Sequence, residues 1–455
     1  MMKTRTFSIY VAVILTMTAT GVFGAVSDEQ AQRLGNDLTP IGAERAGNAD
    51  GTIPAWQGGI GQVPPGFKPG GHHPDPFAQD QISFTITRDN MSEYAGQLTA
   101  GHKALLEQYG DTFRMNIYPT RRSASYPEYV YEATKANALT AELVDNGNGV
   151  EGAIKSVPFP IPQSGLEAIW NHILRFRGTS ARRMLGQAPV TRKGSYTMVM
   201  LEDEYFAPYH LPTAVEADLN NVIIMFRQRV AAPARLAGTI LMAHETMNQN
   251  KQHRMVWLYN PGQRRVRRAP NVAFDNPGTA ADGLRTSDQF DMYNGSPERY
   301  NWELVGKKEM YVPYNAYKLD SGELNYKDII QPLHMNPEVL RYELHRVWVV
   351  EATLKKGVRH IYKRRTFYID EDSWQVLSVD QYDNRDQLWR VSEGHAINYY
   401  EVPTLWTTVD VHYDLQIGRY LALGLNNQEP FTYDYSVNLT AQDFTTGALR
   451  RIGRR

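Results

Sequence analysis

The clearest pattern along the chain is an alternation of apolar and polar positions in four consecutive segments of the C-terminal half. These segments are 343–354, 358–369, 374–382 and 387–399, and a period of two is typical of β-strands. Short connections rich in Gly, Asn, Asp, Ser and Lys join them, which predicts an antiparallel meander. Long neighbouring strands accumulate twist, so we expect the sheet to curl around a hollow.

The same period of two starts upstream, at Gly194, and predicts an antiparallel sheet from there onward. The additional strands are expected at 196–201, 221–230, 238–246 and 252–260. A polar excursion containing Gly, Asn and Asp interrupts the pattern over 269–300.

Residues 91–184 show helical spacing instead. Ser92 is a candidate N-cap for a first helix, and Pro127 can start a second. Ser164 and Glu167 form an S-x-x-E capping box before an apolar run with helical spacing. We therefore expect helices beside the sheet, able to plug its hollow.

The N-terminal part of the chain divides into two segments. In residues 1–24, Lys3 and Arg5 precede an apolar stretch. This stretch is shorter than the roughly 20 residues that a membrane span needs. This predicts a signal peptide cleaved near Gly24 or Ala25. Residues 25–90 are rich in Gly and Pro but carry apolar anchors, which predicts an ordered wrap over a single β-rich domain at 91–455.

Composition narrows the possible functions. The 48 Lys and Arg residues against 49 Asp and Glu residues leave a net charge of −1, which does not favour a nucleic-acid partner. The chain has no cysteine, which excludes disulfides, thiolate metal sites and lipid attachment to a cysteine. With the predicted signal peptide, this indicates a periplasmic protein that is not itself lipidated.

Catalytic motifs are weak. His244 and Glu245 begin a near match to a zinc motif, but Asn248 stands where the second histidine should be. The densest acidic cluster is 202–204, where neighbouring carboxylates on a strand point to opposite faces. No P-loop or nucleophile elbow is present in the sequence, so we expect no catalytic residues, no metal and no cofactor.

Three motifs resemble those of one known family. They are LGNDLTPIGAERAGNADGTIPAW at 34–56, MVWLYNPGQRRVRRAP at 255–270 and NWELVGKKE at 301–309. The family is a periplasmic family of Gram-negative bacteria, of unknown function, whose members are often labelled outer-membrane lipoprotein-sorting proteins. It is similar in fold to the lipoprotein carriers LolA and LolB, and the resemblance covers essentially the whole mature chain.

The resemblance implies a fold of mainly β structure with helices (α+β). It is an incomplete, curled antiparallel β-barrel with a helical plug, here with an N-terminal wrap. It also implies a non-enzymatic carrier or chaperone for a lipid or other hydrophobic cargo in transit to or from the outer membrane. An outer-membrane β-barrel protein or an efflux pump would be a partner. A lipid or glycan hydrolase, using 202–204, and a structural partner of an outer-membrane barrel are the alternatives.

Two groups of residues are candidate binding sites. Apolar side chains on the predicted strands could line the hollow, because methionine and aromatic side chains suit irregular apolar ligands. This group is Met242, Met255, Trp257, Trp348, Val350, Phe367 and Leu377. A run of four arginines after a Pro-Gly turn could bind anionic lipid or a partner, or could simply guard an edge strand. These are Arg264, Arg265, Arg267 and Arg268.

Overall fold

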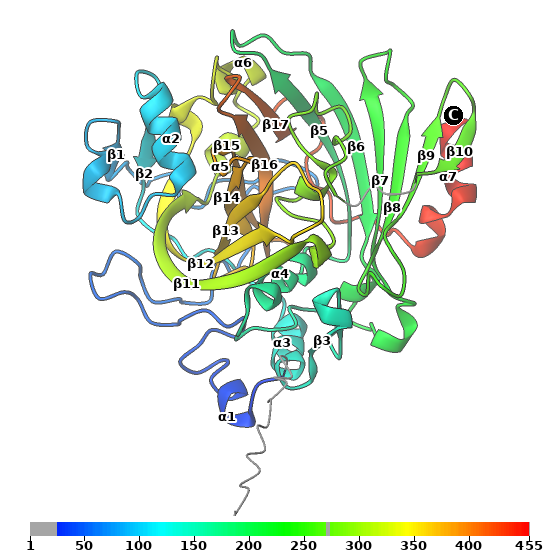
Figure 1. Ribbon diagram of the computed structural model, residues 1–455, viewed down its shortest axis with the longest axis horizontal. Helices are drawn as coiled ribbons and strands as arrows, with labels where there is room; N and C mark the ends of the chain where they lie inside the picture. Colours follow the sequence, from blue (N-terminus) through cyan, green and yellow to red (C-terminus); the bar gives the residue numbers. More distant parts are fainter. Residues whose placement is uncertain (1–24, 270–273, 455) are drawn as a thin grey trace, which may run out of the picture.

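The computed structural model describes residues 25–269 and 274–454, so the predicted signal peptide at 1–24 lies outside the described residues. Within this part of the chain, one fifteen-stranded sheet carries the fold (Figure 1), and β3 (Glu142–Val144) pairs separately with β4 (Gly149–Glu151). The first strands of the large sheet are β1 (Phe84–Ile86), β2 (Met115–Ile117), β5 (Ser180–Val190), β6 (Val199–Phe206), β7 (Val222–Ala232), β8 (Ile240–Thr246), β9 (Met255–Asn260) and β10 (Arg265–Arg268). The remaining strands are β11 (Tyr300–Pro313), β12 (Tyr342–Leu354), β13 (Arg364–Asp370), β14 (Val376–Tyr382), β15 (Leu388–Tyr399), β16 (Thr404–Asp414) and β17 (Arg419–Leu425).

The sheet is curved but open. Its strands follow the order β1-β2-β12-β13-β14-β15-β16-β17-β5-β6-β7-β8-β9-β10, and β11 pairs with β12 beside this path. The edge strands β1 and β10 lie at opposite ends of that order and do not pair with each other in the described structure. A curved sheet whose end strands stay apart is an incomplete barrel, which confirms the predicted fold class of mainly β structure with helices.

The predicted meander is present as β12 to β15, with antiparallel pairing between each neighbouring pair. One boundary differs, because β13 begins at Arg364 and not at 358. Another difference is β5 (180–190), which starts within the segment 91–184 expected to be helical and ends before the sheet expected from Gly194. Its strand conformation comes from pairing on both sides, with the next strand β6 and with β17, and only β17 lies far away in the sequence.

The connection between β12 and β13 contains a glycine whose backbone conformation is unfavourable for other residues. Gly357 has φ of 86°, and an added Cβ atom would meet nothing within 4 Å. Gly357→Val is therefore expected to destabilise the protein by about 1 kcal/mol through backbone strain alone. Urea denaturation measures this, with Lys356→Val in the same exposed turn as the control. Equal midpoints for the two variants would contradict the prediction.

Helices cover parts of the sheet. The longer helices are α2 (Ala100–Tyr109), α3 (Glu128–Thr140), α4 (Gly165–Leu174) and α7 (Thr446–Gly453), and the short ones are α1 (Asp28–Ala31), α5 (Tyr317–Asp320) and α6 (Tyr326–Ile329). The Ser164 hydroxyl accepts a hydrogen bond from the Glu167 amide, as the capping box predicts. The first long helix starts after Thr99 and not after Ser92. Thr99 is its N-cap, because the Thr99 hydroxyl accepts a hydrogen bond from the backbone N–H of His102.

Helix α4 packs against β11 and β12 and is buried along nearly its whole length. Trp170 of this helix shares one hydrophobic cluster with Val350 of β12 and Phe367 of β13. Tyr293, from the excursion between β10 and β11, belongs to the same cluster and contacts the Phe367 ring. The helix and the excursion therefore occupy the same side of this part of the sheet.

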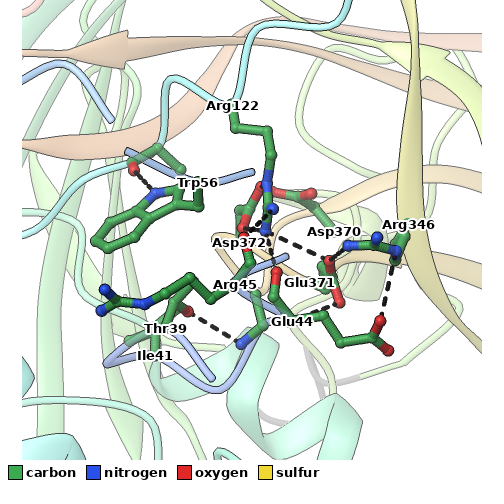
Figure 2. Close-up of polar contacts among 12 residues, drawn as sticks. Thr39, Ile41, Glu44, Arg45, Trp56, Arg122, Arg346, Asp370, Glu371 and Asp372 are labelled. Atoms are coloured by element: carbon green, nitrogen blue, oxygen red, sulfur yellow. Dashed lines mark hydrogen bonds and ion pairs between the residues drawn. The ribbon is translucent and has the colours of Figure 1, made fainter. Parts of the chain in front are cut away.

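Residues 25–90 run along the surface of the sheet domain and are tied to it at several points. The Trp374 indole donates a hydrogen bond to the Ile41 carbonyl oxygen, and the Trp56 indole donates one to the Ala124 carbonyl oxygen. Figure 2 shows the densest attachment, where Arg122 reaches both the wrap and the turn after β13. Its guanidinium donates to the Glu44 carbonyl oxygen at 2.8 Å and to both Asp372 carboxylate oxygens, at 2.6 and 2.8 Å.

Candidate functional site

One pocket of the described structure lies against strands β5 to β9. It contains about 1080 Å³ of empty space, its open mouth included. The strands supply one wall, and the excursion at 277–294 supplies much of the other. Trp406 of β16 and Tyr433 complete the lining.

The pocket is on the concave face of the sheet. Trp406 of β16 and Val256 of β9 both line it, although six strand-to-strand steps separate β16 from β9. At about 4.8 Å per step, a flat sheet would place these strands roughly 29 Å apart. Both can face one pocket only because the sheet curves around it.

One wall of the pocket is apolar. It is built from alternate residues of three neighbouring strands, namely Ile224, Phe226, Leu241, Ala243 and Val256. The Phe290 ring of the excursion lies 5.2 Å from the Phe226 ring, measured between centroids. Because alternate side chains of a strand share a face, this wall follows directly from the register of β7, β8 and β9.

The adjoining part of the pocket, on β5 to β7, is charged, and most of its charges are paired. Arg183 contacts Asp203 at 2.9 Å, and the Gln228 amide donates to the other Asp203 oxygen at 2.9 Å. Burial nevertheless raises the pKa of Asp203. These groups lie on β5, β6 and β7, so cross-strand pairing brings them together.

Asp291 is the centre of a second charged group at the pocket. It pairs with Arg175, at 2.6 Å, and with Arg177, and it also accepts a hydrogen bond from the Trp406 indole at 2.8 Å. Burial disfavours its charged form, but the two guanidiniums hold its pKa well below the ordinary value. The carboxylate is therefore ionised and joins the excursion to the end of α4.

Three of the predicted lining residues point away from the pocket. Met242 and Trp257 belong to a cluster on the other face of β8 and β9, where Leu449 of α7 covers them. The register pairs Met242 with Trp257, and places Met255 opposite His244 on that same outer face. The face of β8 and β9 that was expected to point into the hollow therefore points outward. Neighbouring residues of a strand lie on opposite faces, so the residues next to those predicted face the pocket instead.

The other four predicted residues lie elsewhere. Val350 and Phe367 face the same side as α4, but Trp170 and Tyr293 fill that space. Trp348 stacks on Trp374, with 6.2 Å between ring centroids, and Leu377 belongs to a separate cluster on the opposite face. The seven residues therefore do not form one cavity, and none of them lines the pocket of β5 to β9.

The acidic residues 202–204 lie within β6 and not at its end. Asp203 turns toward the pocket, while Glu202 and Glu204 pair with Arg229 and Arg227 of β7. The three carboxylates therefore do not converge on a single point. This arrangement offers no pair of adjacent free carboxylates for general acid and base chemistry.

The four arginines at 264–268 lie at the edge of the sheet. Arg264 is in the turn before β10, the other three are in β10, and all four are exposed. Figure 1 shows this edge beside α7, at one side of the molecule. Within the described residues, none of the four forms an ion pair, so their charges face solvent.

One group of side chains has the composition of a metal site. Potential ligand atoms of His345, Asp370 and Asp372 lie within 4.8 Å of one another, and all three residues are buried. Both Asp372 oxygens already accept hydrogen bonds from Arg122, and His345 Nε2 contacts Glu343 at 3.0 Å. Arg122 thus supplies the positive charge that a cation would bring, and the group is an internal ion network.

Asp370 gives this network a dependence on pH. Burial and the neighbouring Asp372 carboxylate raise the pKa of Asp370 to about 7. Its ordinary value is about 3.9, so the stability that it contributes is complete below about pH 4 and is lost as the pH rises through about 7. Asp370→Asn is expected to be more stable than the wild type at about pH 8, and to lose this advantage near pH 4.

Urea denaturation at several pH values measures this difference. The exposed Asp386→Asn is the control, because it should leave the pH profile unchanged. A constant difference between Asp370→Asn and the wild type across this range would show that Asp370 does not titrate there.

Comparison with known proteins assigns the chain to a family. Residues 85–450 match the family model described as protein of unknown function (DUF1329). The chain belongs to the DUF1329 family. This confirms the family expected from the three motifs. A relative from Pseudomonas aeruginosa, named Uncharacterized protein PA3922, is 51% identical over 455 residues and is covered completely, as is this chain.

Several solved structures are also similar to this DUF1329 chain. A putative outer membrane lipoprotein-sorting protein domain from Vibrio parahaemolyticus is 14% identical, with a TM-score of 0.39, and 60% of this chain and 92% of that one are covered. A DUF1329 protein from Desulfovibrio piger is 16% identical, with the same TM-score and coverage. A LolA superfamily protein from Nitrosomonas europaea is 12% identical, with a TM-score of 0.36 and coverage of 61% and 94%.

Sequence reasoning missed the residues that do line the pocket. Arg183 lay in the segment expected to be helical, Asp203 was a charged position beside an expected strand, and Asp291 lay in an excursion without a predicted role. The strand face turned toward the pocket carries Leu241, Ala243 and Val256, and no local signal separates this face from its opposite. The facing elements decide which side is enclosed.

Proposed function

We propose that this protein is a periplasmic, non-enzymatic carrier that binds a hydrophobic molecule in the pocket of its curved sheet. The observation that supports this is the apolar wall of Ile224, Phe226, Leu241, Ala243 and Val256 on the concave face. Burial of an alkyl chain contributes about 0.8 kcal/mol per CH₂ group, so such a wall can hold a ligand without a reactive group. Among the described residues, no helix combines the length and apolar character needed to cross a membrane.

The name of one similar solved structure is compatible with this proposal. One solved neighbour is named a putative outer membrane lipoprotein-sorting protein domain. A place between the two membranes, and an outer-membrane barrel or an efflux pump as partner, belong to the same proposal. The hydrolase alternative has less support, because the carboxylates of the pocket are paired with arginines.

Filling the pocket tests the proposal directly. Ala243 lies in the middle of the apolar wall, so Ala243→Trp should occupy the space that an alkyl chain would take. The affinity for a neutral fluorescent apolar dye should fall by at least about tenfold, while the protein stays folded. Trp257→Ala is the control, because Trp257 packs on the outer face against α7. A wild type that binds no apolar dye would refute the carrier function.

The exposed arginines of the β10 edge are proposed as a contact site for an anionic surface. Changing Arg264, Arg265, Arg267 and Arg268 to Gln should reduce binding to vesicles that contain anionic phospholipid. The wild-type binding should weaken with salt, because exposed charges are screened beyond about 8 Å at physiological ionic strength. Vesicle co-sedimentation measures both effects. Unchanged binding by the variant would leave these arginines as guards of an edge strand.

A further inference from the structure

One charge of the pocket lining lacks a counter-charge. The lining contains five arginines and three carboxylates. Four of these arginines have carboxylate partners: Arg177 pairs with Asp291, Arg183 with Asp203, Arg254 with Glu245, and Arg182 with Asp434 outside the pocket. Arg285 is the fifth, and it forms no ion pair within 4.0 Å among the described residues.

Arg285 is nevertheless buried. The residue is 5% exposed, and its Nε atom has no hydrogen-bond partner in the described structure. The hydrogen bond that its side chain does make is a long one, from Nη1 to the Thr286 carbonyl oxygen at 3.4 Å. A buried guanidinium without a carboxylate costs free energy, which is why such groups are normally paired.

The three carboxylates whose charges act on Arg285 form no ion pair with it. Asp203 is paired with Arg183, and Asp288 contacts both Arg365 and His360. Asp410 also acts on Arg285 through its charge, but lies outside ion-pair distance. Burial consequently lowers the pKa of Arg285 to about 10, so the group remains cationic at neutral pH.

The arginine adjoins the apolar wall. Its guanidinium carbon lies 5.7 Å from the centre of the Phe290 ring, and this ring is 5.2 Å from that of Phe226. A cationic group and an apolar surface are therefore continuous within one pocket. A molecule with an anionic group at the end of an alkyl chain could pair with the cationic group and cover the apolar surface.

We propose that the ligand is an anionic amphiphile, whose carboxylate or phosphate group pairs with Arg285 while its alkyl chain lies along Phe290, Phe226 and the strand wall. This inference rests on the proposed carrier function and specifies the chemical class of the cargo. The guanidinium is the recognition group because it can donate two parallel hydrogen bonds to either anion. The binding energy of the anion would offset the cost of leaving Arg285 unpaired in the empty protein.

Competition with a neutral fluorescent dye tests the assignment on the mature protein. The competitors are decanoic acid, decyl phosphate and decanol, which share a chain and differ in the head group. The wild type should bind at least one of the two anions about tenfold or more tightly than decanol. The ratio of the two anions shows whether a carboxylate or a phosphate is preferred.

Arg285→Gln should remove the preference for the anions and keep the affinity for decanol. Arg285→Lys should retain a reduced preference, and the exposed Arg385→Gln should behave like the wild type. The melting temperature of Arg285→Gln without ligand should be equal or higher, because an unpaired buried charge is removed. A lower melting temperature would identify Arg285 as a structural group instead.

The outcomes separate this inference from the carrier function. A wild type that binds decanol and both anions equally would overturn the role of Arg285, and would leave the carrier function intact. A wild type that binds none of the three competitors, nor the dye, would refute both.

Discussion

Asp291→Asn is expected to destabilise the protein by roughly 3–5 kcal/mol, because it leaves two buried guanidiniums without a counter-charge. Arg175 and Arg177 both pair with this carboxylate, and Arg175 is fully buried. Asparagine keeps the shape of the side chain, so the loss reports the charge and not a cavity. The same change should loosen the excursion at Asp291, while the contacts of His172 Nε2 with the Asp291 and Tyr293 carbonyl oxygens still hold it to α4.

Urea denaturation gives the free energy of unfolding. Asp386→Asn is the matched control, since Asp386 pairs with Arg364 at an exposed position and should lose less than about 1 kcal/mol. A loss below about 1 kcal/mol for Asp291→Asn as well would mean that solvent reaches Arg175 and Arg177.

Arg122→Met is expected to have an effect of similar size, roughly 3–5 kcal/mol, and to loosen the N-terminal wrap. Removing the guanidinium takes away the arginine that pairs with the buried Asp372 carboxylate, and it removes the hydrogen bond to the Glu44 carbonyl oxygen. Glu371 keeps its ion pairs with Lys307 and Arg346. Figure 2 shows how one side chain links the wrap to the turn after β13. Methionine preserves most of the apolar volume, so the lost charge dominates.

Limited proteolysis, read beside the melting temperature, measures this second prediction. Cleavage within the wrap should become faster than cleavage within the sheet. The control is Arg33→Met, whose half-exposed ion pair with Asp37 should contribute little. Equal protection of the wrap in Arg122→Met and in the wild type would show that its apolar anchors hold it without Arg122.

The sequence was informative wherever a signal is local. Ser164 with Glu167 marked the start of α4, since a cap depends on residues within one helical turn. The meander β12 to β15 followed from alternation and short connections, because neighbouring strands in a hairpin pair with each other. The three motifs were sufficient to predict the family.

The sequence was uninformative wherever a feature depends on partners far away in the chain. Strand β5 followed helical segments and had no local signal, because β17 pairs with it from about 230 residues later. The arginines and carboxylates of the pocket could not be paired in advance, since Asp291 meets Arg175 only after the excursion folds against α4.

For the pocket as well, the sequence predicted one part and the tertiary structure determined the other. Alternation in β8 and β9 established that each strand has two faces, one with Met242 and Trp257 and the other with Ala243 and Val256. Both faces are apolar, so the pattern alone could not say which one is enclosed. Helix α7 covers the first face, and the curve of the sheet with its excursion encloses the second, including the unpaired Arg285. Burial is a property of what packs against a residue, and so the tertiary structure decided where this protein has its pocket.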